Sequence, residues 1–260
     1  MNNLKVSATE NDFLFVGVDI GGTKVAAGLV NADGEITSHV RVPMVNGTAQ
    51  DGLDAVLSAI GKALPKDSRS VQGIGICAPG PLDPRNGVIL NPPNLPCWRN
   101  FPLADEVQKA YAVPVKVDND ANAAALAEAR WGAARGCSSV FYATLGTGIG
   151  TGIVFDGKIF HGRTGAAGEG GHVSIDYRGP TCVCGKPGCI EVFASGTAIV
   201  KRVRARISEG RKSLISDMAK DRLNLLIETV VTSDGVTLAL DVGLIINGAA
   251  CDVDSRSSLD

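Results

Sequence analysis

The sequence predicts a globular α/β protein built from two lobes. Three observations carry this prediction: a length of 260 residues, 45% hydrophobic beside 20% charged residues, and a glycine-rich loop with a following strand and Asp-Gly turn that occurs twice. A domain commonly holds about 100–200 residues, so the length allows one large domain or two compact lobes. The composition is that of ordinary soluble proteins, which excludes a disordered chain and a fibrous repeat.

The first lobe is expected to span residues 13–134, after a loose leader at residues 1–12. A near-continuous apolar run predicts a buried strand at Phe13–Ile20, and the turn signal Asp33-Gly34 predicts that the next two strands form a hairpin. Further strands are expected at Val25–Val30, Ile36–Val42, Val71–Ala78 and Val113–Val117, and helices at Leu53–Leu64, Leu103–Tyr111 and Ala121–Ala134. The proline-rich residues 79–102 are expected to form an ordered surface loop.

The second lobe is expected to span residues 138–260 and begins like the first. A strand at Val140–Leu145 leads into a second glycine-rich run, a strand at Ile153–Phe155 and an Asp156-Gly157 turn. This order repeats that of the first lobe, which indicates a faint internal duplication. Two more helices are expected, at residues 195–207 and 214–229.

Charge and the first residues narrow the class of function. Lys and Arg number 25 against 27 Asp and Glu, a net charge of -2, so no global positive field attracts nucleic acid or an anionic membrane. The start of the chain lacks the basic and apolar regions of a signal peptide, and no run of about 18 apolar residues occurs. We therefore expect a cytoplasmic protein with a small-molecule partner, and neither nucleic-acid nor membrane binding.

Both glycine loops are candidate phosphate sites, because glycine lets backbone N–H groups face an anion without interference from side chains. Asp19 could orient a magnesium-bound water, Thr23 and Lys24 could contact a phosphate, and the second loop offers Thr147 and Gly148. Tight hairpin entries are the alternative interpretation of either loop. Neither loop matches the P-loop or the Rossmann dinucleotide fingerprint, so those folds have little support.

A cysteine cluster predicts a metal site. Cys182, Cys184 and Cys189 lie within eight residues, and His172 precedes Cys182 by ten. Three thiolates and one imidazole can surround zinc as a tetrahedron. Since the protein would fill all four positions, the zinc is expected to be structural. Unliganded thiols are the alternative, which the reactivity of clustered exposed thiols disfavours.

Several acids are candidates for chemistry or recognition. Asp120 follows a strand and precedes a helix, so it could accept a proton from a substrate hydroxyl or serve as the N-cap of that helix. Glu169 and Glu191 flank the cysteine cluster and are either ordinary solvated acids or rigidly held partners for the hydroxyls of a polyol.

Four motifs together resemble the ROK family of sugar kinases and repressors, over roughly residues 13–210. They are Asp19-Ile-Gly-Gly-Thr-Lys24, Asn119-Asp120, Glu169-Gly-Gly-His172 and Cys182-x-Cys184-Gly-x-x-Gly-Cys189-x-Glu191. The first motif alone indicates only the broader fold, whereas the last two are specific. The resemblance implies a two-lobed actin-like ATPase (ribonuclease H-like) fold, with a zinc knuckle in the second lobe and with ATP, magnesium and a sugar in the cleft between the lobes.

The resemblance also implies roles on the sugar side. Asp120 would be the base that takes the proton of the sugar 6-hydroxyl as it attacks the γ-phosphate of ATP, and Asn119 would bind ring hydroxyls. Asn94-Leu-Pro-Cys97-Trp98 is similar to the Asn-Leu-Pro-Gly-Trp loop of glucokinase-type members, whose Asn meets the sugar. The remaining sugar contacts would be Glu169, His172 and Glu191, with His172 also a zinc ligand beside Cys182, Cys184 and Cys189.

On the nucleotide side, the resemblance assigns ATP and magnesium to the two glycine loops. The residues concerned are Asp19, Gly21, Gly22, Thr23, Lys24, Gly146, Thr147 and Gly148. The end of the chain departs from the family pattern, in which a glycine-rich segment holds adenosine. Residues 233–260 offer only Val242 to Gly248 and a polar tail. We therefore expect a second lobe that is incomplete at its end, by truncation or a shift of reading frame after about residue 230.

The expected function is ATP-dependent phosphorylation of the 6-hydroxyl of a hexose, with glucose first and a homodimer as the assembly. Mannose, N-acetylglucosamine and fructose are alternative substrates, since pocket geometry decides among them. Polyphosphate is a weaker alternative donor. A catalytically impaired or truncated sugar-binding member is the alternative function. A repressor is disfavoured, because twelve leader residues cannot supply a helix-turn-helix.

Overall fold

The computed structural model describes residues 13–65, 71–211, 229–231, 237–239 and 243–244. The chain divides into two compact units, Met1–Ala123 (unit 1) and Ala124–Asp260 (unit 2). Of the features expected from the sequence, the leader, the incomplete end and most of the helix at 214–229 lie outside the described residues. The last residue of that predicted helix, Thr229, lies in a strand.

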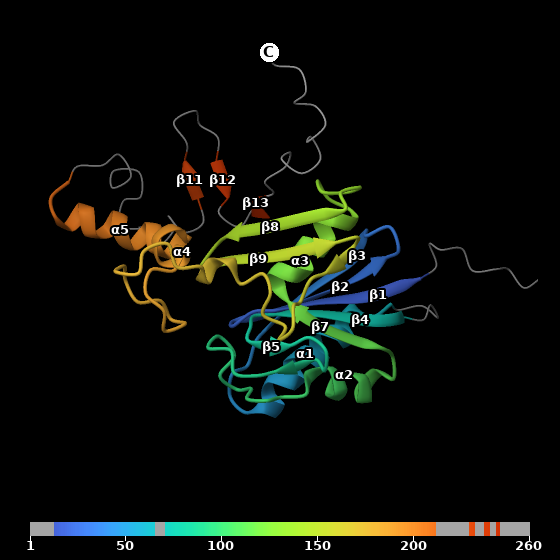
Figure 1. Cartoon of the computed structure of the whole chain (residues 1–260). Helices are drawn as coiled ribbons and strands as arrows, with labels where there is room; N and C mark the ends of the chain where they lie inside the picture. Colours follow the sequence, from blue (N-terminus) through green and yellow to red (C-terminus); the bar gives the residue numbers. More distant parts are fainter. Residues whose placement is uncertain (1–12, 66–70, 212–228, 232–236, 240–242, 245–260) are drawn as a thin grey trace, which may run out of the picture. The chain divides into compact units, whose positions relative to one another are not determined.

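Unit 1 is built on a five-stranded mixed sheet with the order β3-β2-β1-β4-β7 (Figure 1). The first three strands form an antiparallel meander that contains the predicted hairpin, and β4 and β7 extend the sheet in parallel beyond β1. The strands are β1 (Leu14–Ile20), β2 (Lys24–Asn31), β3 (Ile36–Pro43), β4 (Val71–Ala78) and β7 (Val115–Asn119). The carboxyl ends of β1, β4 and β7 therefore lie at one edge, where open α/β sheets place ligands.

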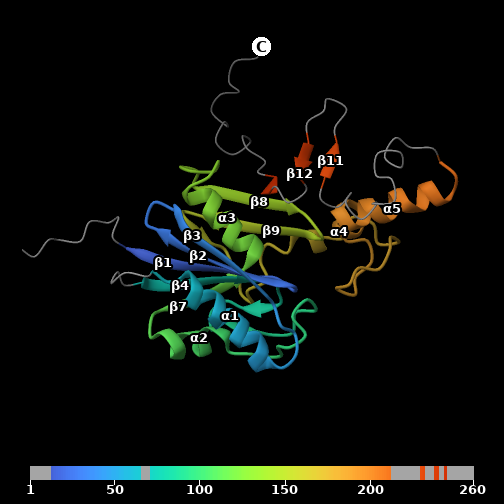
Figure 2. The same cartoon turned by 180° about the vertical axis from the view of Figure 1, so that it is seen from behind.

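Helices α1 (Ala49–Ala63) and α2 (Leu103–Tyr111) lie on the same side of this sheet, as both views show (Figures 1 and 2). Helix α2 has its predicted bounds, whereas α1 begins four residues before the predicted start. A capping box explains the difference: Thr48 Oγ1 accepts the N–H of Asp51 at 3.2 Å, and Asp51 Oδ2 accepts the N–H of Thr48 at 2.7 Å.

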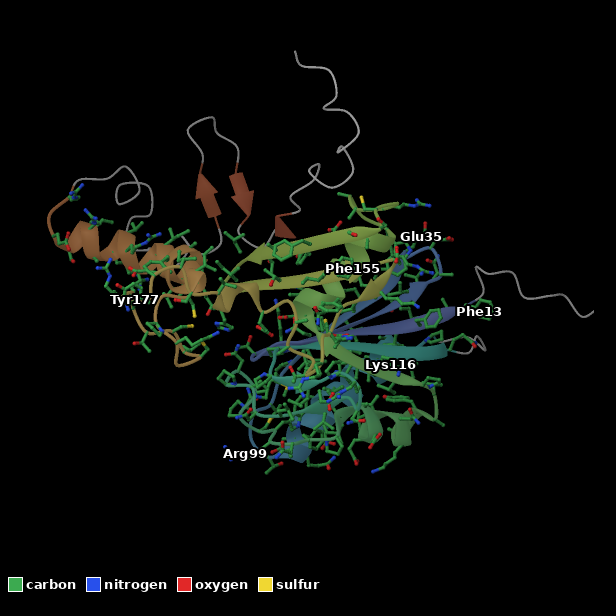
Figure 3. All side chains as sticks on the ribbon, in the orientation of Figure 1. Phe13, Glu35, Arg99, Lys116, Phe155 and Tyr177 are labelled. Atoms are coloured by element: carbon green, nitrogen blue, oxygen red, sulfur yellow. The ribbon has the colours of Figure 1, made fainter. Side chains whose placement is uncertain are left out.

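Buried and exposed side chains alternate along β1, and the buried ones contribute to the core of unit 1. Val16, Val18 and Ile20 are buried, whereas Phe15 is 42% exposed, so β1 buries one face instead of both as its apolar run suggested. Phe13, immediately before the strand, is also exposed (Figure 3). The same alternation leaves Asp19 on the exposed face, at the end of the strand that leads into the first glycine loop.

The proline-rich loop is ordered and anchored as the sequence predicts. It contains the paired short strands β5 (Leu82–Asp83) and β6 (Val88–Ile89). Leu95 and Trp98 are buried at 0% and 1% exposure, and the indole Nε1 of Trp98 donates to the carbonyl of Ala49 in α1 at 3.1 Å. These anchors hold the Asn94 segment against helix α1.

Unit 2 contains a four-stranded antiparallel sheet with the order β10-β9-β8-β13. Its strands are β8 (Ser139–Leu145), β9 (Ile149–Phe155), β10 (Lys158–Ile159) and β13 (Gly243–Leu244). The predicted repeat is present in both units, because a glycine loop joins β1 to β2 and another joins β8 to β9 as antiparallel pairs. Strand β9 begins four residues before its predicted start, so the second loop is shorter than expected.

Helix α3 (Asp120–Arg130) crosses the division between the units. Ala125 of this helix packs in a core with Val140, Tyr142 and Val154 of unit 2. From the sequence, this helix was predicted to end at Ala134 and to lie wholly in the first lobe. In the structure α3 ends at Arg130, and its residues from Ala124 onward belong to unit 2.

The rest of unit 2 carries the cysteine segment. A short 3₁₀ turn, η2 (Gly170–His172), precedes it, and α4 (Ile190–Ala194) and α5 (Gly196–Ser208) follow. Strands β11 (Thr229–Val231) and β12 (Thr237–Ala239) form an antiparallel pair. Among the residues that the structure describes, no helix combines the length and apolar character needed to cross a membrane.

Candidate functional site

The first glycine loop and the Asn94 segment lie against each other in unit 1. A Cβ atom on Gly22 would stand only 2.9 Å from the carbonyl oxygen of Asn94. Asn46 adds a second connection, since its Nδ2 donates to the carbonyl of Gly22 at 2.7 Å and its Oδ1 lies 3.5 Å from the thiol of Cys97. The structure thus brings together two predicted site residues, Gly22 and Asn94. Asn46 connects their two segments, and no local pattern in the sequence predicts this role.

Asp19, Cys77 and Asp118 occupy neighbouring positions on β1, β4 and β7. The thiol of Cys77 donates to Asp19 Oδ1 at 3.6 Å. Burial, followed by the negative charges of Asp19 and Asp120, raises the pKa of the Cys77 thiol. Cys77 therefore stays protonated and acts as a hydrogen-bond donor to Asp19, a role that no pattern in the sequence indicates.

Asp120 is the first residue of α3, but the neighbouring Asn119 caps the helix. Asn119 Oδ1 accepts the N–H groups of Ala121 and Asn122 at 2.9 and 3.3 Å, whereas Asp120 Oδ1 accepts the adjacent N–H of Ala121 at 2.8 Å. The Asp120 side chain reaches solvent, yet surrounding protein removes much of its water. This desolvation, together with the negative charge of Asp19, raises the pKa of Asp120, which makes its carboxylate a stronger base.

The second glycine loop, between β8 and β9, is held from two sides in unit 2. The carbonyl of Gly146 accepts the N–H of Gly196 at 2.9 Å, and Glu191 Oε2 accepts the N–H of Ile149 at 2.9 Å. Thr147 at the tip is exposed. Glu191, which the resemblance assigns to the sugar, thus also fixes the end of the second glycine loop.

The turn at Glu169–His172 brings His172 to the cysteines. The N–H of His172 donates to the carbonyl of Glu169 at 3.1 Å, and His172 Nδ1 lies 3.4 Å from Cys182 Sγ. The Glu169 side chain is exposed. Tyr177, in the loop that leads to the cysteines, is exposed as well (Figure 3).

The geometry of the cysteine cluster fits a tetrahedral metal ion. One ligand atom from each of His172, Cys182, Cys184 and Cys189 lies within 4.8 Å of the others. Zinc–sulfur bonds of about 2.3 Å place two sulfur ligands of a tetrahedron about 3.8 Å apart. Cys184 Sγ and Cys189 Sγ are 3.6 Å apart. The distances and the soft donor set therefore suit zinc.

The site residues predicted from the sequence divide between the two units. Unit 1 carries Asp19, Gly21, Gly22, Thr23, Lys24, Asn94, Asn119 and Asp120. Unit 2 carries Gly146, Thr147, Gly148, Glu169, His172, Cys182, Cys184, Cys189 and Glu191. Within unit 1 the structure groups Gly22 with Asn94 and Asp19 with Asp120, and within unit 2 it groups the four predicted metal ligands and connects Glu191 with the second glycine loop.

Comparisons with known proteins identify the family. Residues 15–251 match the ROK family. A glucokinase of Thermotoga maritima is 40% identical over 205 residues, which cover 78% of this chain and 64% of that protein. A xylose repressor of Caldicellulosiruptor bescii is 36% identical over 200 residues, which cover 75% of this chain and 50% of the repressor. This chain therefore spans less than two thirds of the length of both relatives.

A solved structure agrees with these sequence matches. The crystal structure of a ROK family glucokinase from Streptomyces griseus, in complex with glucose and AMPPNP, superposes with a TM-score of 0.68 at 39% identity, covering 81% of this chain and 67% of the other. The predicted α/β class and the predicted resemblance are thereby confirmed. The chain belongs to the ROK family.

Proposed function

We propose that this protein phosphorylates the 6-hydroxyl of a hexose, with glucose as the first substrate and ATP as the donor. The observation that carries the proposal is the placement of Asp120 directly after β7, near Asp19 and on the sheet edge that bears the first glycine loop. Desolvation there raises the pKa of the Asp120 carboxyl. The glucokinase relative from Thermotoga maritima and the Streptomyces griseus structure with glucose and a nucleotide analogue support the choice of substrates.

In this proposal Asp120 accepts the proton of the 6-hydroxyl as that oxygen attacks the γ-phosphate. A positioned base typically contributes about 10²–10⁴-fold to the rate. Asn94 and Asn119 bind ring hydroxyls. Asn119 Oδ1 already caps α3 and its side chain also hydrogen-bonds Asp120, so the remaining amide N–H of Asn119 would donate to the sugar.

The two glycine loops align the phosphates of ATP in the same proposal. The N–H groups of Gly21 and Gly146 close their loops by donating to the carbonyls of Lys24 and Gly148 at 2.8 and 3.0 Å. The N–H groups of Gly22 and Gly148 would therefore be the ones that bind the anion, with Thr23, Lys24 and Thr147 beside them. Asp19 would hold magnesium, because carboxylates and substrate phosphates are its usual ligands. Magnesium, when bound with ATP, neutralises the charge that develops on the transferred phosphoryl group.

On the side of unit 2, Glu169, His172 and Glu191 hydrogen-bond the hexose. His172, Cys182, Cys184 and Cys189 would hold zinc, whose contribution when bound is a rigid anchor for this segment. Glu191 follows the predicted ligand Cys189 by two residues, and Glu191 Oε2 accepts the N–H of Ile149 at 2.9 Å. The anchor therefore acts through Glu191 on the glycine loop as well as on the sugar contacts.

The test measures formation of the sugar phosphate by the purified full chain over glucose, mannose, N-acetylglucosamine and fructose, with either ATP or polyphosphate as the donor. Glucose-dependent consumption of ATP is the expected result. Glucose binding without consumption of either donor would instead identify a catalytically impaired sugar-binding member.

The role of Asp120 is tested in the same assay. Asp120→Ala is expected to lower kcat at least about 100-fold and to leave the glucose dissociation constant nearly unchanged. Asp118→Asn is the matched control, since it removes a neighbouring carboxylate while an amide oxygen can still accept from Asn119 and Asn122. Comparable turnover by Asp120→Ala and Asp118→Asn would refute the assignment of the base.

A further inference from the structure

Thr151 lies on β9, just beyond the second glycine loop, and is buried at 8% exposure. Its Oγ1 accepts the N–H of Gly170 at 2.7 Å and donates to the carbonyl of Gly168. These two backbone groups flank Glu169. One buried hydroxyl therefore holds the main chain on both sides of a residue whose own side chain is exposed.

The turn that follows Glu169 packs directly on the same strand. A Cβ on Gly171 would overlap the carbonyl of Ile149, so the backbone of the turn approaches β9 as closely as a glycine permits. His172 comes next and reaches Cys182. The position of both Glu169 and His172 thus depends on how this turn packs on β9. The Thr151 hydroxyl bonds to the start of the turn, and the Cys189 thiol donates to the carbonyl of His172 at its end, at 3.4 Å.

We propose that Thr151 is a positioning residue for hexose recognition, because its hydroxyl fixes the turn that presents Glu169 and His172. This inference rests on the proposed function of the site. The half-buried N–H of Gly170 also donates to the carbonyl of Gly168 at 2.8 Å, so without the hydroxyl the two groups keep this bond but lose their connection to β9. The turn is then expected to shift away from the strand, where water can replace the lost hydrogen bonds. Glu169 would then leave the geometry that binds the sugar, although neither Glu169 nor His172 has changed.

Two substitutions separate the hydroxyl from the shape of the side chain. Thr151→Val keeps the shape and removes the hydroxyl, whereas Thr151→Ser keeps the hydroxyl and removes a methyl group. With the full chain, the glucose dissociation constant is measured by calorimetry without nucleotide. Thr151→Val is expected to weaken glucose binding about tenfold, which corresponds to a loss of about 1.4 kcal/mol of binding free energy. Thr151→Ser is expected to restore most of the affinity, because it keeps the hydroxyl.

Two further readouts distinguish positioning from a general loss of stability. The KM for glucose should rise by a larger factor than kcat falls in Thr151→Val, since sugar binding is lost and the base is untouched. The absorption spectrum of the Co²⁺-substituted protein should change in Thr151→Val and return in Thr151→Ser, because His172 lies on the displaced turn. If Thr151→Val does not fold, Thr151→Cys, with its weaker donor, is expected to show an intermediate loss of affinity.

The outcomes are distinct. Glucose affinity and a Co²⁺ spectrum unchanged in Thr151→Val would overturn the proposal, as would equal losses in Thr151→Val and Thr151→Ser. A wild-type chain that binds no hexose of the panel would refute the proposed function itself. A wild-type chain that binds glucose beside a Thr151→Val chain that binds equally well would refute only the role of Thr151.

Discussion

Gly22→Ala tests whether the first glycine loop and the Asn94 segment must stay in close contact. The new Cβ would stand 2.9 Å from the carbonyl oxygen of Asn94, whereas ordinary contacts begin at 3.4 Å. The obstacle is backbone, so no side chain can rotate away. The two segments must separate by roughly half an ångström to reach an ordinary contact distance.

The magnitude follows from this displacement. A misplacement of about 1 Å can cost about 10²-fold in rate, so half of it is expected to lower kcat/KM about tenfold. Overpacking commonly destabilises by about 1–3 kcal/mol, and in a chain of this size each kcal/mol shifts Tm by about 2–4 °C. Because Asn94 is the partner that moves, the affinity for glucose should fall even without nucleotide.

The assay combines calorimetry of glucose binding with steady-state kinetics, and Gly21→Ala is its matched control. A Cβ on Gly21 would meet only the carbonyl of Lys24, at 3.4 Å, so this variant is expected to bind glucose as the wild type does. The reasoning would be refuted if Gly22→Ala matched Gly21→Ala in glucose affinity and thermal stability.

Two predictions concern the charged and metal-binding groups. The raised pKa of Asp120 means that its ionisation opposes folding, so the stability linked to its protonated form is present below the ordinary value of 3.8 and is lost as pH rises through the raised pKa. Thermal melts should therefore give Asp120→Asn a higher Tm than the wild type at neutral pH, and this difference should vanish as the pH falls toward 3.8. Equal Tm values of the two proteins at every pH would contradict the raised pKa of Asp120. Cys184→Ser should lower zinc content in elemental analysis and weaken glucose affinity, because His172 and Glu191 lose their anchor; wild-type glucose affinity in a zinc-free variant would count against it.

Short sequence patterns predicted the bounds of those strands and helices that neighbouring residues in the chain define. The strand Val71–Ala78 and the helix Leu103–Tyr111 have their predicted bounds, because apolar spacing and flanking breakers define both. The start of α1 was missed although Thr48 and Asp51 form a capping box that is visible in the sequence. Helix α3 stops short of its predicted end because alanine-rich sequence alone does not specify where tertiary packing ends a helix.

The site divides in the same way. The spacing of Cys182, Cys184 and Cys189 was sufficient to predict that their sulfurs and His172 gather in one place. The contacts of Asn46 with Gly22 and of Thr151 with Gly170 join residues far apart in the chain, and no local pattern encodes them. The sequence therefore predicted the residues whose side chains can bind a metal, such as the cysteines and His172. It did not predict residues such as Asn46 and Thr151, which position other residues through hydrogen bonds.

The placement of the two tryptophans gives each unit its own optical reporter. Trp98 belongs to unit 1 and is 1% exposed, whereas Trp131 belongs to unit 2 and is 48% exposed. Iodide in the buffer should quench the emission of Trp131 strongly and that of Trp98 hardly at all. A chain with Trp131→Phe would report denaturation of unit 1 alone, so fluorescence can reveal whether both halves melt in one cooperative transition.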